Sequence, residues 1–212
     1  MLMSKMFSVG CLSANCYVVN CRETKEAVII DPGFSSYQEA EQIISFIKSY
    51  DLKLKFIINT HGHPDHTCGN GLIKSNFDVP ICIHKDDAYM IGDSGIETAR
   101  YFGFDKVSPP ADILLADCDY VKFGDVTIKV IHSPGHSRGS VLFLGETELF
   151  SGDTLFAGSI GRTDFPGSSN LQMQASLKRL LQFPDYFIVY SGHGPSTTIA
   201  EERRVNPFLQ DL

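Results

Sequence analysis

The chain has 212 residues, of which 43% are hydrophobic and 20% charged, and its formal net charge at pH 7 is −7. This composition can supply the core of a single domain over residues 1–212, and the acidic balance, without a long lysine or arginine run, argues against a nucleic-acid partner. No stretch of about 18 apolar residues could span a bilayer, and the apolar N-terminal segment is too short for a secretory signal, so we expect a cytoplasmic protein without a membrane partner.

Short apolar runs separated by turn residues predict a series of strands along the chain. The predicted strands cover residues 16–20, 27–31, 55–60, 80–84, 119–123, 126–132, 141–145, 148–152 and 187–192. Turn pairs such as Gly124-Asp125 and Gly145-Glu146 join several of them, as is typical of antiparallel neighbours.

Two segments, 37–50 and 171–181, repeat apolar residues with the i, i+3, i+4, i+7 spacing of an amphipathic helix. The expected apolar faces are Ala40, Ile43, Ile44 and Ile47 in the first helix, and Leu171, Ala175, Leu177 and Leu181 in the second. The faces of a sheet need covering, and these helices lie far apart in the chain. We therefore expect an α/β fold with helices on both sides.

The chain also contains cysteines, at positions 11, 16, 21, 68, 82 and 118. None forms a C-x-x-C pair, and Cys16 and Cys82 lie in apolar strand-like runs, where a thiol behaves as a small hydrophobic group. We expect reduced thiols in or near the core, in line with a reducing cytosol.

Histidine and aspartate side chains follow the ends of several predicted strands, where loops on a rigid scaffold commonly build sites. These residues are His61, His63, Asp65, His66, His136, Asp153 and His193. In a loop leaving a strand, His61 and His63 point the same way, whereas Asp65 and His66, just past a proline, can project together on another side. This geometry suits two adjacent metal ions better than one.

The segment THGHPDH at residues 60–66, followed by the later His, Asp and His, resembles the signature of the metallo-β-lactamase superfamily over essentially the whole chain. The resemblance implies an αββα sandwich with two mixed sheets flanked by helices. It implies two divalent metal ions per chain, with zinc favoured and iron or manganese also acceptable to imidazole and carboxylate ligands. The implied ligands are His61, His63 and His136 for one ion, Asp65, His66 and His193 for the other, and Asp153 as a bridge.

Residues 150–169 and 190–209 resemble the short bacterial glyoxalase II-like hydrolases more closely. This resemblance implies hydrolysis of a small-molecule glutathione thioester, such as S-lactoylglutathione, by a hydroxide shared between two metals. Asp65 would orient the nucleophile and receive its proton.

The lactamase branch has a cysteine, or no bridging ligand, in place of Asp153, which disfavours antibiotic hydrolysis. Longer glyoxalase II enzymes bind glutathione with a C-terminal helical domain, for which the chain leaves no room, so we expect Arg162 to bind its carboxylates.

Other interpretations remain open at this point. The run Gly161 to Phe165, GRTDF, is similar to the persulfide dioxygenases, which use a single iron, although the segment around His193 argues against that reading. A metal-stabilised binding module without catalysis is disfavoured, because a structural site closes with four ligands. Arg162 can also simply pair with Asp164 across its loop.

Three further polar residues are expected beside the site or in the core, and not as ligands. His84 and His132 match no ligand position, and Asp31 in IIDPG is expected to be hydrogen-bonded near the site or in a turn. Cys68 lies close to His66 in the sequence but in the wrong context for a ligand. The sequence indicates no oligomeric state.

Overall fold

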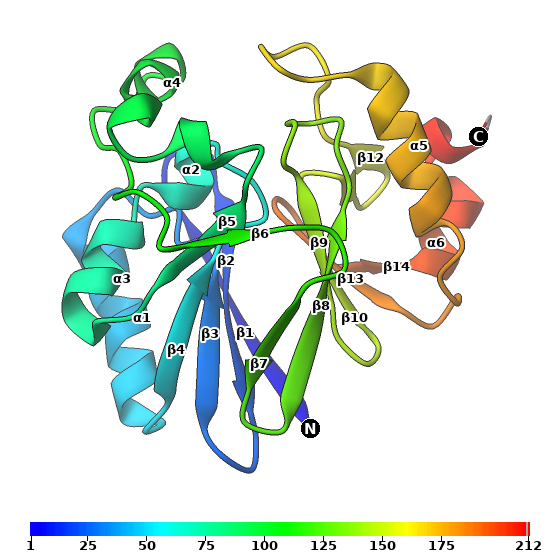
Figure 1. The fold of residues 1–212 in the computed structure, drawn as a ribbon. Coiled ribbons are helices and arrows are strands. Elements are labelled where there is room, and N and C mark those ends of the chain that lie inside the picture. Colours follow the sequence, from blue (N-terminus) through cyan, green and yellow to red (C-terminus); the bar gives the residue numbers. More distant parts are fainter. Residues whose placement is uncertain (211) are drawn as a thin grey trace.

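Two six-stranded sheets face each other in the structure, and helices cover their outer faces (Figure 1). The computed structural model describes residues 1–210 and 212. This arrangement confirms the predicted αββα sandwich of two mixed sheets flanked by helices. In the described part of the chain, no helix is long and apolar enough to cross a membrane.

The N-terminal sheet changes from antiparallel to parallel pairing along its width. Its spatial order is β1 (Leu2–Val9), β2 (Ala14–Cys21), β3 (Glu26–Ile30), β4 (Lys53–Ile58), β5 (Ile81–His84) and β6 (Ile113–Leu115). The pairs from β1 to β3 are antiparallel and those from β3 to β6 are parallel. Parallel neighbours need crossover connections, and α1 (Tyr37–Ser49) and α3 (Asn70–Phe77) lie in two of these.

The second sheet is antiparallel except where β10 pairs with β13. Its spatial order is β14 (Thr197–Thr198), β13 (Ile188–Ser191), β10 (Glu148–Gly152), β9 (Val141–Leu144), β8 (Val126–His132) and β7 (Tyr120–Phe123). The crossover from β10 to β13 holds a small hairpin, β11 (Leu155–Phe156) with β12 (Ser159–Ile160), and then α5 (Asn170–Leu180). Helix α6 (Ile199–Val205) follows β14.

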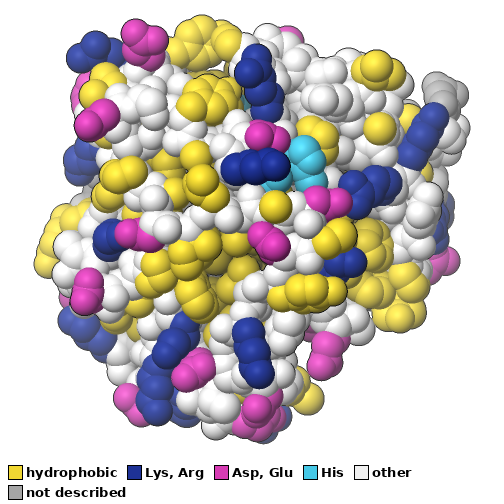
Figure 2. Space-filling model, viewed as in Figure 1, with side chains coloured by type: hydrophobic (Ala, Val, Ile, Leu, Met, Phe, Trp, Pro, Cys, Tyr) yellow, Lys and Arg dark blue, Asp and Glu magenta, His cyan; other side chains and the backbone are white. Residues whose placement is uncertain are grey.

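Short helices fill the loops at the site end of the sandwich. They are α2 (Pro64–Thr67), α4 (Ile96–Tyr101) and the 3-10 turns Ala88–Met90 and Asp93–Gly95, with a further 3-10 turn, Pro207–Leu209, near the C-terminus. Between the sheets, Phe123, Phe143 and Phe150 are fully buried in a shared core. On the visible face, charged side chains of both signs surround a central group of hydrophobic ones (Figure 2).

Helix α1 confirms the predicted apolar face. Ser36 and Glu39 form a capping box at its N-terminus, which satisfies backbone N–H groups that lack a partner within the helix. The helix buries Ala40, Ile43, Ile44 and Ile47, the four residues that the spacing indicated. This burial covers the outer face of the N-terminal sheet.

Helix α5 exists where it was predicted, but the predicted face was only partly right: Leu177 is buried and Leu181 is partly buried, whereas the other two residues are exposed. Leu171 is 78% exposed, and Ala175 also faces solvent. The residues that the helix buries are Met173, Ser176, Leu177 and Leu180. Ser176 sits on the buried face because its hydroxyl donates to the Pro134 carbonyl at 2.8 Å, so a polar residue interrupts the apolar period.

Every predicted strand is present, with ends shifted by no more than two residues. The prediction missed β1, β6, β11, β12 and β14. β1 is the edge strand of its sheet, and most of its residues are exposed, so its sequence lacks the alternation of a half-buried strand. The other four are strands of two or three residues.

Candidate metal centre

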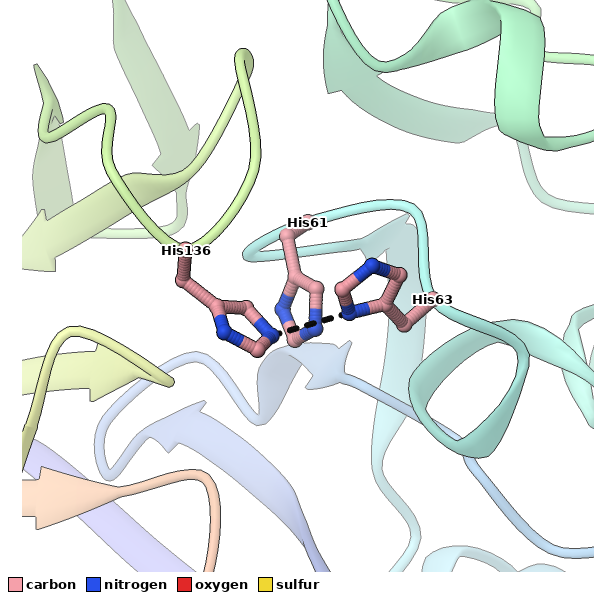
Figure 3. Close-up of side chains that lie close together, drawn as sticks. All are labelled: His61, His63 and His136. Atoms are coloured by element: carbon pink, nitrogen blue, oxygen red, sulfur yellow. Dashed lines mark hydrogen bonds between the residues drawn. The ribbon is translucent and has the colours of Figure 1, made fainter. Parts of the chain in front are cut away.

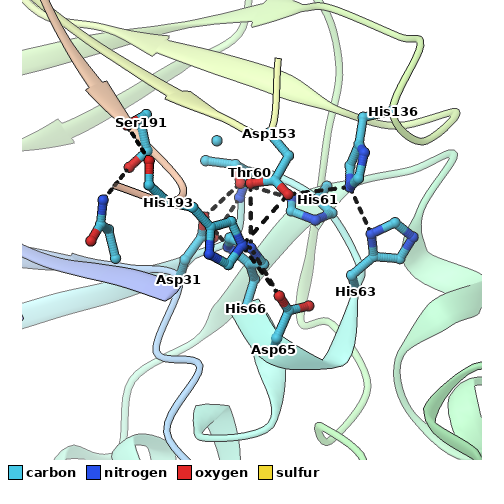
Figure 4. A network of polar contacts seen from close by, with 12 residues as sticks. Asp31, Thr60, His61, His63, Asp65, His66, His136, Asp153, Ser191 and His193 are labelled. Atoms are coloured by element: carbon cyan, nitrogen blue, oxygen red, sulfur yellow. Dashed lines mark hydrogen bonds and ion pairs between the residues drawn. The ribbon is translucent and has the colours of Figure 1, made fainter. Parts of the chain in front are cut away.

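The predicted ligand residues all lie together at one end of the sandwich, in loops that follow strands of both sheets (Figure 4). They are His61, His63, Asp65 and His66 after β4, His136 after β8, Asp153 after β10 and His193 after β13. The two sheets therefore contribute to one site.

Three histidines form the first group. The side chains of His61, His63 and His136 are buried, and one nitrogen of each lies within 4.8 Å of the others (Figure 3). His63 Nδ1 is 2.8 Å from His136 Nε2. Only nitrogen atoms face the centre of this group, so we call it the three-histidine set.

The second group combines two histidines with a carboxylate. Asp65 Oδ2 lies 3.4 Å from His193 Nε2 and 3.5 Å from His66 Nε2, and the two histidine nitrogens are 3.2 Å apart. Asp65 and His66 project from α2, while His193 comes from the opposite sheet. This group, the Asp65 set, is the more open one, because the His193 side chain is 26% exposed.

Asp153 lies between the two sets. Its Oδ2 is 3.4 Å from His136 Nε2 in the first set, and its Oδ1 is 3.5 Å from His66 Nε2 in the second. Gly192 leaves room for this carboxylate, since a Cβ at that position would lie 2.2 Å from Asp153 Oδ1. A single carboxylate can therefore contact both sets.

Hydrogen bonds to fixed acceptors determine which nitrogen each histidine offers. His136 Nδ1 donates to the Arg162 carbonyl at 2.9 Å, and His193 Nδ1 donates to the Leu12 carbonyl at 3.2 Å. Carbonyl oxygens only accept, so both Nδ1 atoms carry hydrogen. In the neutral rings, the Nε2 lone pairs therefore point to the centre.

Asp31 orients two further histidines from outside the site. Its Oδ2 accepts from His66 Nδ1 at 3.1 Å and from the Thr60 hydroxyl at 2.6 Å, and that hydroxyl in turn accepts from His61 Nδ1 at 3.1 Å. Asp31 adopts a left-handed φ of 51° and also accepts from the Thr60 N–H. The expectation of a hydrogen-bonded residue beside the site is confirmed.

Two buried polar atoms indicate that the residues fit a divalent cation. Among the described residues, His61 Nε2 and Asp153 Oδ1 are the buried side-chain nitrogen and oxygen atoms without a hydrogen-bond partner. Burying such atoms unpaired is costly. Both face the same space as the other Nε2 atoms, and imidazole nitrogen and carboxylate oxygen are ligands that zinc, iron(II) and manganese accept.

The electrostatics of the two sets are opposite. Burial and the neighbouring imidazoles hold the pKa of His61 well below its ordinary value and lower that of His63 to about 3. Burial also disfavours the charged form of His66, but the carboxylates of Asp65, Asp153 and Asp31 outweigh it and raise the pKa of His66 to about 10. His61 and His63 are thus neutral, whereas His66 in the Asp65 set forms ion pairs with the surrounding carboxylates.

Sequence reasoning missed Asp87, which ties together the loops of the three-histidine set. This buried carboxylate accepts from the Gly62 N–H at 3.0 Å, the Ser137 hydroxyl at 2.6 Å and the Gly139 N–H at 2.6 Å. Burial raises its pKa. Its position a few residues past the strand at 80–84 matches the pattern used for the other aspartates and could have identified it.

The Arg162 side chain pairs with Asp164, one of the two interpretations left open. Arg162 Nη2 lies 2.8 Å from Asp164 Oδ2, both side chains are 65% exposed, and the guanidinium lies over the Phe165 ring, 4.2 Å from its centroid. The Arg162 carbonyl meanwhile holds His136. A role in substrate binding stays a prediction.

The remaining polar residues mostly follow expectation. The rings of His84 and His132 stack on each other at 4.3 Å. Cys68 directs its thiol to the Gly33 carbonyl and is no part of either set. All six cysteines are free, as predicted, and four of them are buried, but the expectation of a position in or near the core was wrong for Cys11 and Cys118, which are exposed.

The chain is similar to known proteins in both sequence and structure. The Metallo-beta-lactamase superfamily matches residues 9–193. The protein named hydroxyacylglutathione hydrolase GloC of Haemophilus influenzae is 35% identical, over 97% of each chain.

Three solved structures are similar over nearly the whole chain. BLEG-1 B3 metallo-beta-lactamase is 37% identical with a TM-score of 0.89, covering 98% of this chain and 99% of its own. TTHA1623 in a di-iron-bound form is 36% identical with a TM-score of 0.85, covering 97% and 100%. ETHE1 from Myxococcus xanthus is 26% identical with a TM-score of 0.80, covering 97% and 83%.

Proposed function

Because this chain belongs to the metallo-beta-lactamase superfamily, we propose that it is a metal-dependent hydrolase of glutathione thioesters such as S-lactoylglutathione. The observation that carries the proposal is the position of Asp153, whose two oxygens reach one histidine of each set at 3.4 and 3.5 Å. That arrangement supports a pair of metal ions, with zinc the first expectation. The similarity to GloC supports the choice of substrate.

The proposed ligands divide between the two sets. His61, His63 and His136 would hold one ion, Asp65, His66 and His193 the other, and Asp153 both. When bound, two divalent cations would lower the pKa of a bound water far below its ordinary value and would polarise an adjacent carbonyl oxygen.

The chain's own residues would direct the attack. Water adds to the acyl carbon, the carbon–sulfur bond breaks, and the products are a carboxylate and the glutathione thiol. Asp65 would orient the attacking water and accept its proton; its carboxylate lies 3.4 Å from His193, the more exposed of the two side chains, which supports this role. A thiolate is a good leaving group, so the reaction needs no strong acid on the leaving side.

The deciding experiment is a thioester hydrolysis assay under strict anaerobic conditions. We expect S-lactoylglutathione to be cleaved at the aerobic rate by both zinc-loaded and iron-loaded protein. Glutathione persulfide should cause no O₂ uptake above that of a protein-free control. Absence of thioester cleavage with either metal would contradict the proposal.

A second candidate is a single-iron persulfide dioxygenase. The observation that favours it is the loop Gly161 to Phe165, which has the GRTDF sequence and supports His136 through the Arg162 carbonyl. Iron-dependent O₂ consumption with glutathione persulfide, absent with zinc, would establish this candidate. The similarity to BLEG-1 adds a β-lactam to the substrates worth assaying, although Asp153 argued against that activity in the sequence.

A further inference from the structure

A cavity of about 190 Å³ opens directly beside the three-histidine set. His63 forms part of its wall, and the other walls come from the 3-10 turn at Tyr89, from α4 and from Pro166. Its surface is mainly apolar, with Tyr89, Tyr101 and Phe102 supplying aromatic rings. A substrate whose reacting carbon lies at the metal centre could extend a side group into this space.

Aromatic contacts connect this cavity to the ligands. The Phe102 ring lies 4.6 Å from the His63 ring and 5.0 Å from the Phe165 ring, measured between centroids. Phe165 in turn contacts His136 at 5.8 Å. The wall of the cavity is therefore continuous with the site.

The lining favours the acyl half of a thioester over the glutathione half. Glutathione carries two carboxylates and an ammonium group, which would lose their hydration in an apolar cavity. The acidic side chain that lines it, Glu97, has the same sign as those carboxylates. Arg162 lies outside this lining, over Phe165, where a carboxylate could reach it from solvent.

We propose, on the basis of the proposed function, that this cavity binds the acyl group and that the preferred substrates are glutathione thioesters of aryl-substituted acids. A cavity of about 150 Å³ is known to hold benzene, so 190 Å³ accommodates one aromatic ring. Rings at Tyr101 and Phe102 offer edge-to-face contacts to it. A lactoyl group would leave most of the space unfilled.

The first test compares S-phenylacetylglutathione with S-acetylglutathione and S-lactoylglutathione on the metal-loaded protein. Each kcat/KM is divided by the rate of uncatalysed hydrolysis of the same thioester, which removes differences in intrinsic reactivity. We expect the phenylacetyl substrate to exceed the acetyl one by at least about tenfold, since apolar groups in such a pocket discriminate at that level. Equal or lower values would overturn the inference while leaving the thioesterase function intact.

A matched pair of variants tests whether the preference for the phenylacetyl substrate arises in this cavity. Thr98→Phe places a ring in the cavity, whereas Ile96→Phe places one on the same helix at an exposed position outside the lining. Thr98→Phe should reduce the phenylacetyl-to-acetyl ratio at least about fivefold, and Ile96→Phe should keep the ratio of the unmodified protein. A ratio unchanged in Thr98→Phe would place the acyl group elsewhere.

Equilibrium binding separates this inference from the proposed function. Calorimetry would compare S-(2-phenylethyl)glutathione with S-methylglutathione, neither of which can be hydrolysed. If no thioester is cleaved, the proposed function is wrong, yet tighter binding of the phenylethyl compound that is lost in Thr98→Phe still supports an aryl-binding cavity. Equal binding of both thioethers would overturn it.

Discussion

The three-histidine set and the Asp65 set lie side by side but hold their histidines by opposite means. His61 and His63 are kept neutral by burial and by each other, whereas His66 is surrounded by carboxylates and kept charged in the absence of metal. A cation entering the first set meets lone pairs. A cation entering the second must replace a proton, but it also meets more negative charge. One end of this fold can therefore place uncharged imidazoles beside a charged imidazole–carboxylate network, with Asp153 in contact with both.

Removing the shared carboxylate should have the largest effect on metal binding, because Asp153 contacts both sets. In Asp153→Ala both sets lose the same ligand, so the metal affinity of both should fall together. We expect a fall of more than ~100-fold, which is the upper value when a residue that only supports a ligand is replaced. Elemental analysis should show close to two metals per chain before the substitution. A single tightly held metal that His193→Ala leaves untouched would contradict the paired site and favour the single-iron candidate.

The residues behind the ligands can separate the two sets. Asp31 contacts His66 directly and His61 only through the Thr60 hydroxyl, while Asp87 holds the loops that present His63 and His136. We expect Asp31→Asn to weaken metal binding mainly in the Asp65 set, and Asp87→Asn mainly in the three-histidine set, each by about 10- to 100-fold. Titration with a metal indicator would measure both affinities.

Glu202 provides the control for these two variants. It is also a buried carboxylate, and it accepts from the Thr197 hydroxyl, the Gly158 N–H and the Asn206 side chain, away from the site. Glu202→Gln should lower stability without changing either metal affinity. Equal losses of metal in all three variants would mean that they report general destabilisation and not ligand positioning.

The opposite pKa shifts of His63 and His66 predict different pH dependences of metal binding. The pKa of His66 in the metal-free fold, about 10, lies above its ordinary value of 6.5. Protonated His66 therefore contributes fully to the stability of the metal-free fold below pH 6.5, and this contribution is lost as the pH rises through about 10. Metal binding to the Asp65 set should therefore strengthen about tenfold per pH unit for each proton released. His63, with a pKa of about 3, needs no such release above that pH.

Two variants allow this difference to be measured. His193→Ala leaves the three-histidine set complete, and His63→Ala leaves the Asp65 set complete. Chelator competition between pH 6 and 8 should give a nearly flat affinity for the first variant and a rising one for the second. Parallel slopes would show that the carboxylates around His66 do not control its proton.

Replacing Arg162 should have the smallest effect on activity, because its side chain is exposed and its contact with His136 is made by the backbone carbonyl. Its carbonyl continues to hold His136 in Arg162→Ala, so metal content should stay the same while KM for a glutathione thioester rises, up to about fivefold, more than kcat falls. Asp164→Asn releases the guanidinium from its partner and should lower KM. Unchanged KM in both variants would leave the loop pair as the only role of this side chain.

The sequence indicated which side chains would lie together, because they follow strands whose apolar runs are strong signals. His61 and His193 could be placed by this rule alone, without knowledge of how the sheets pack. Asp87 was missed because its role depends on three donors from two distant loops. The face of α5 was misjudged because the Ser176 hydroxyl finds its acceptor only once the Pro134 loop is in place.

The contact between the first hairpin and the last ligand also bears on how the protein is made. Ala14 forms an isolated bridge with His193, and the side chains of Asn15 and Tyr17 both donate to the Ser191 carbonyl. His66 and His193 are separated by 127 positions in the chain. During synthesis, His61, His63 and His136 all emerge before His193, so the Asp65 set can be completed only when the segment with His193 joins the N-terminal hairpin.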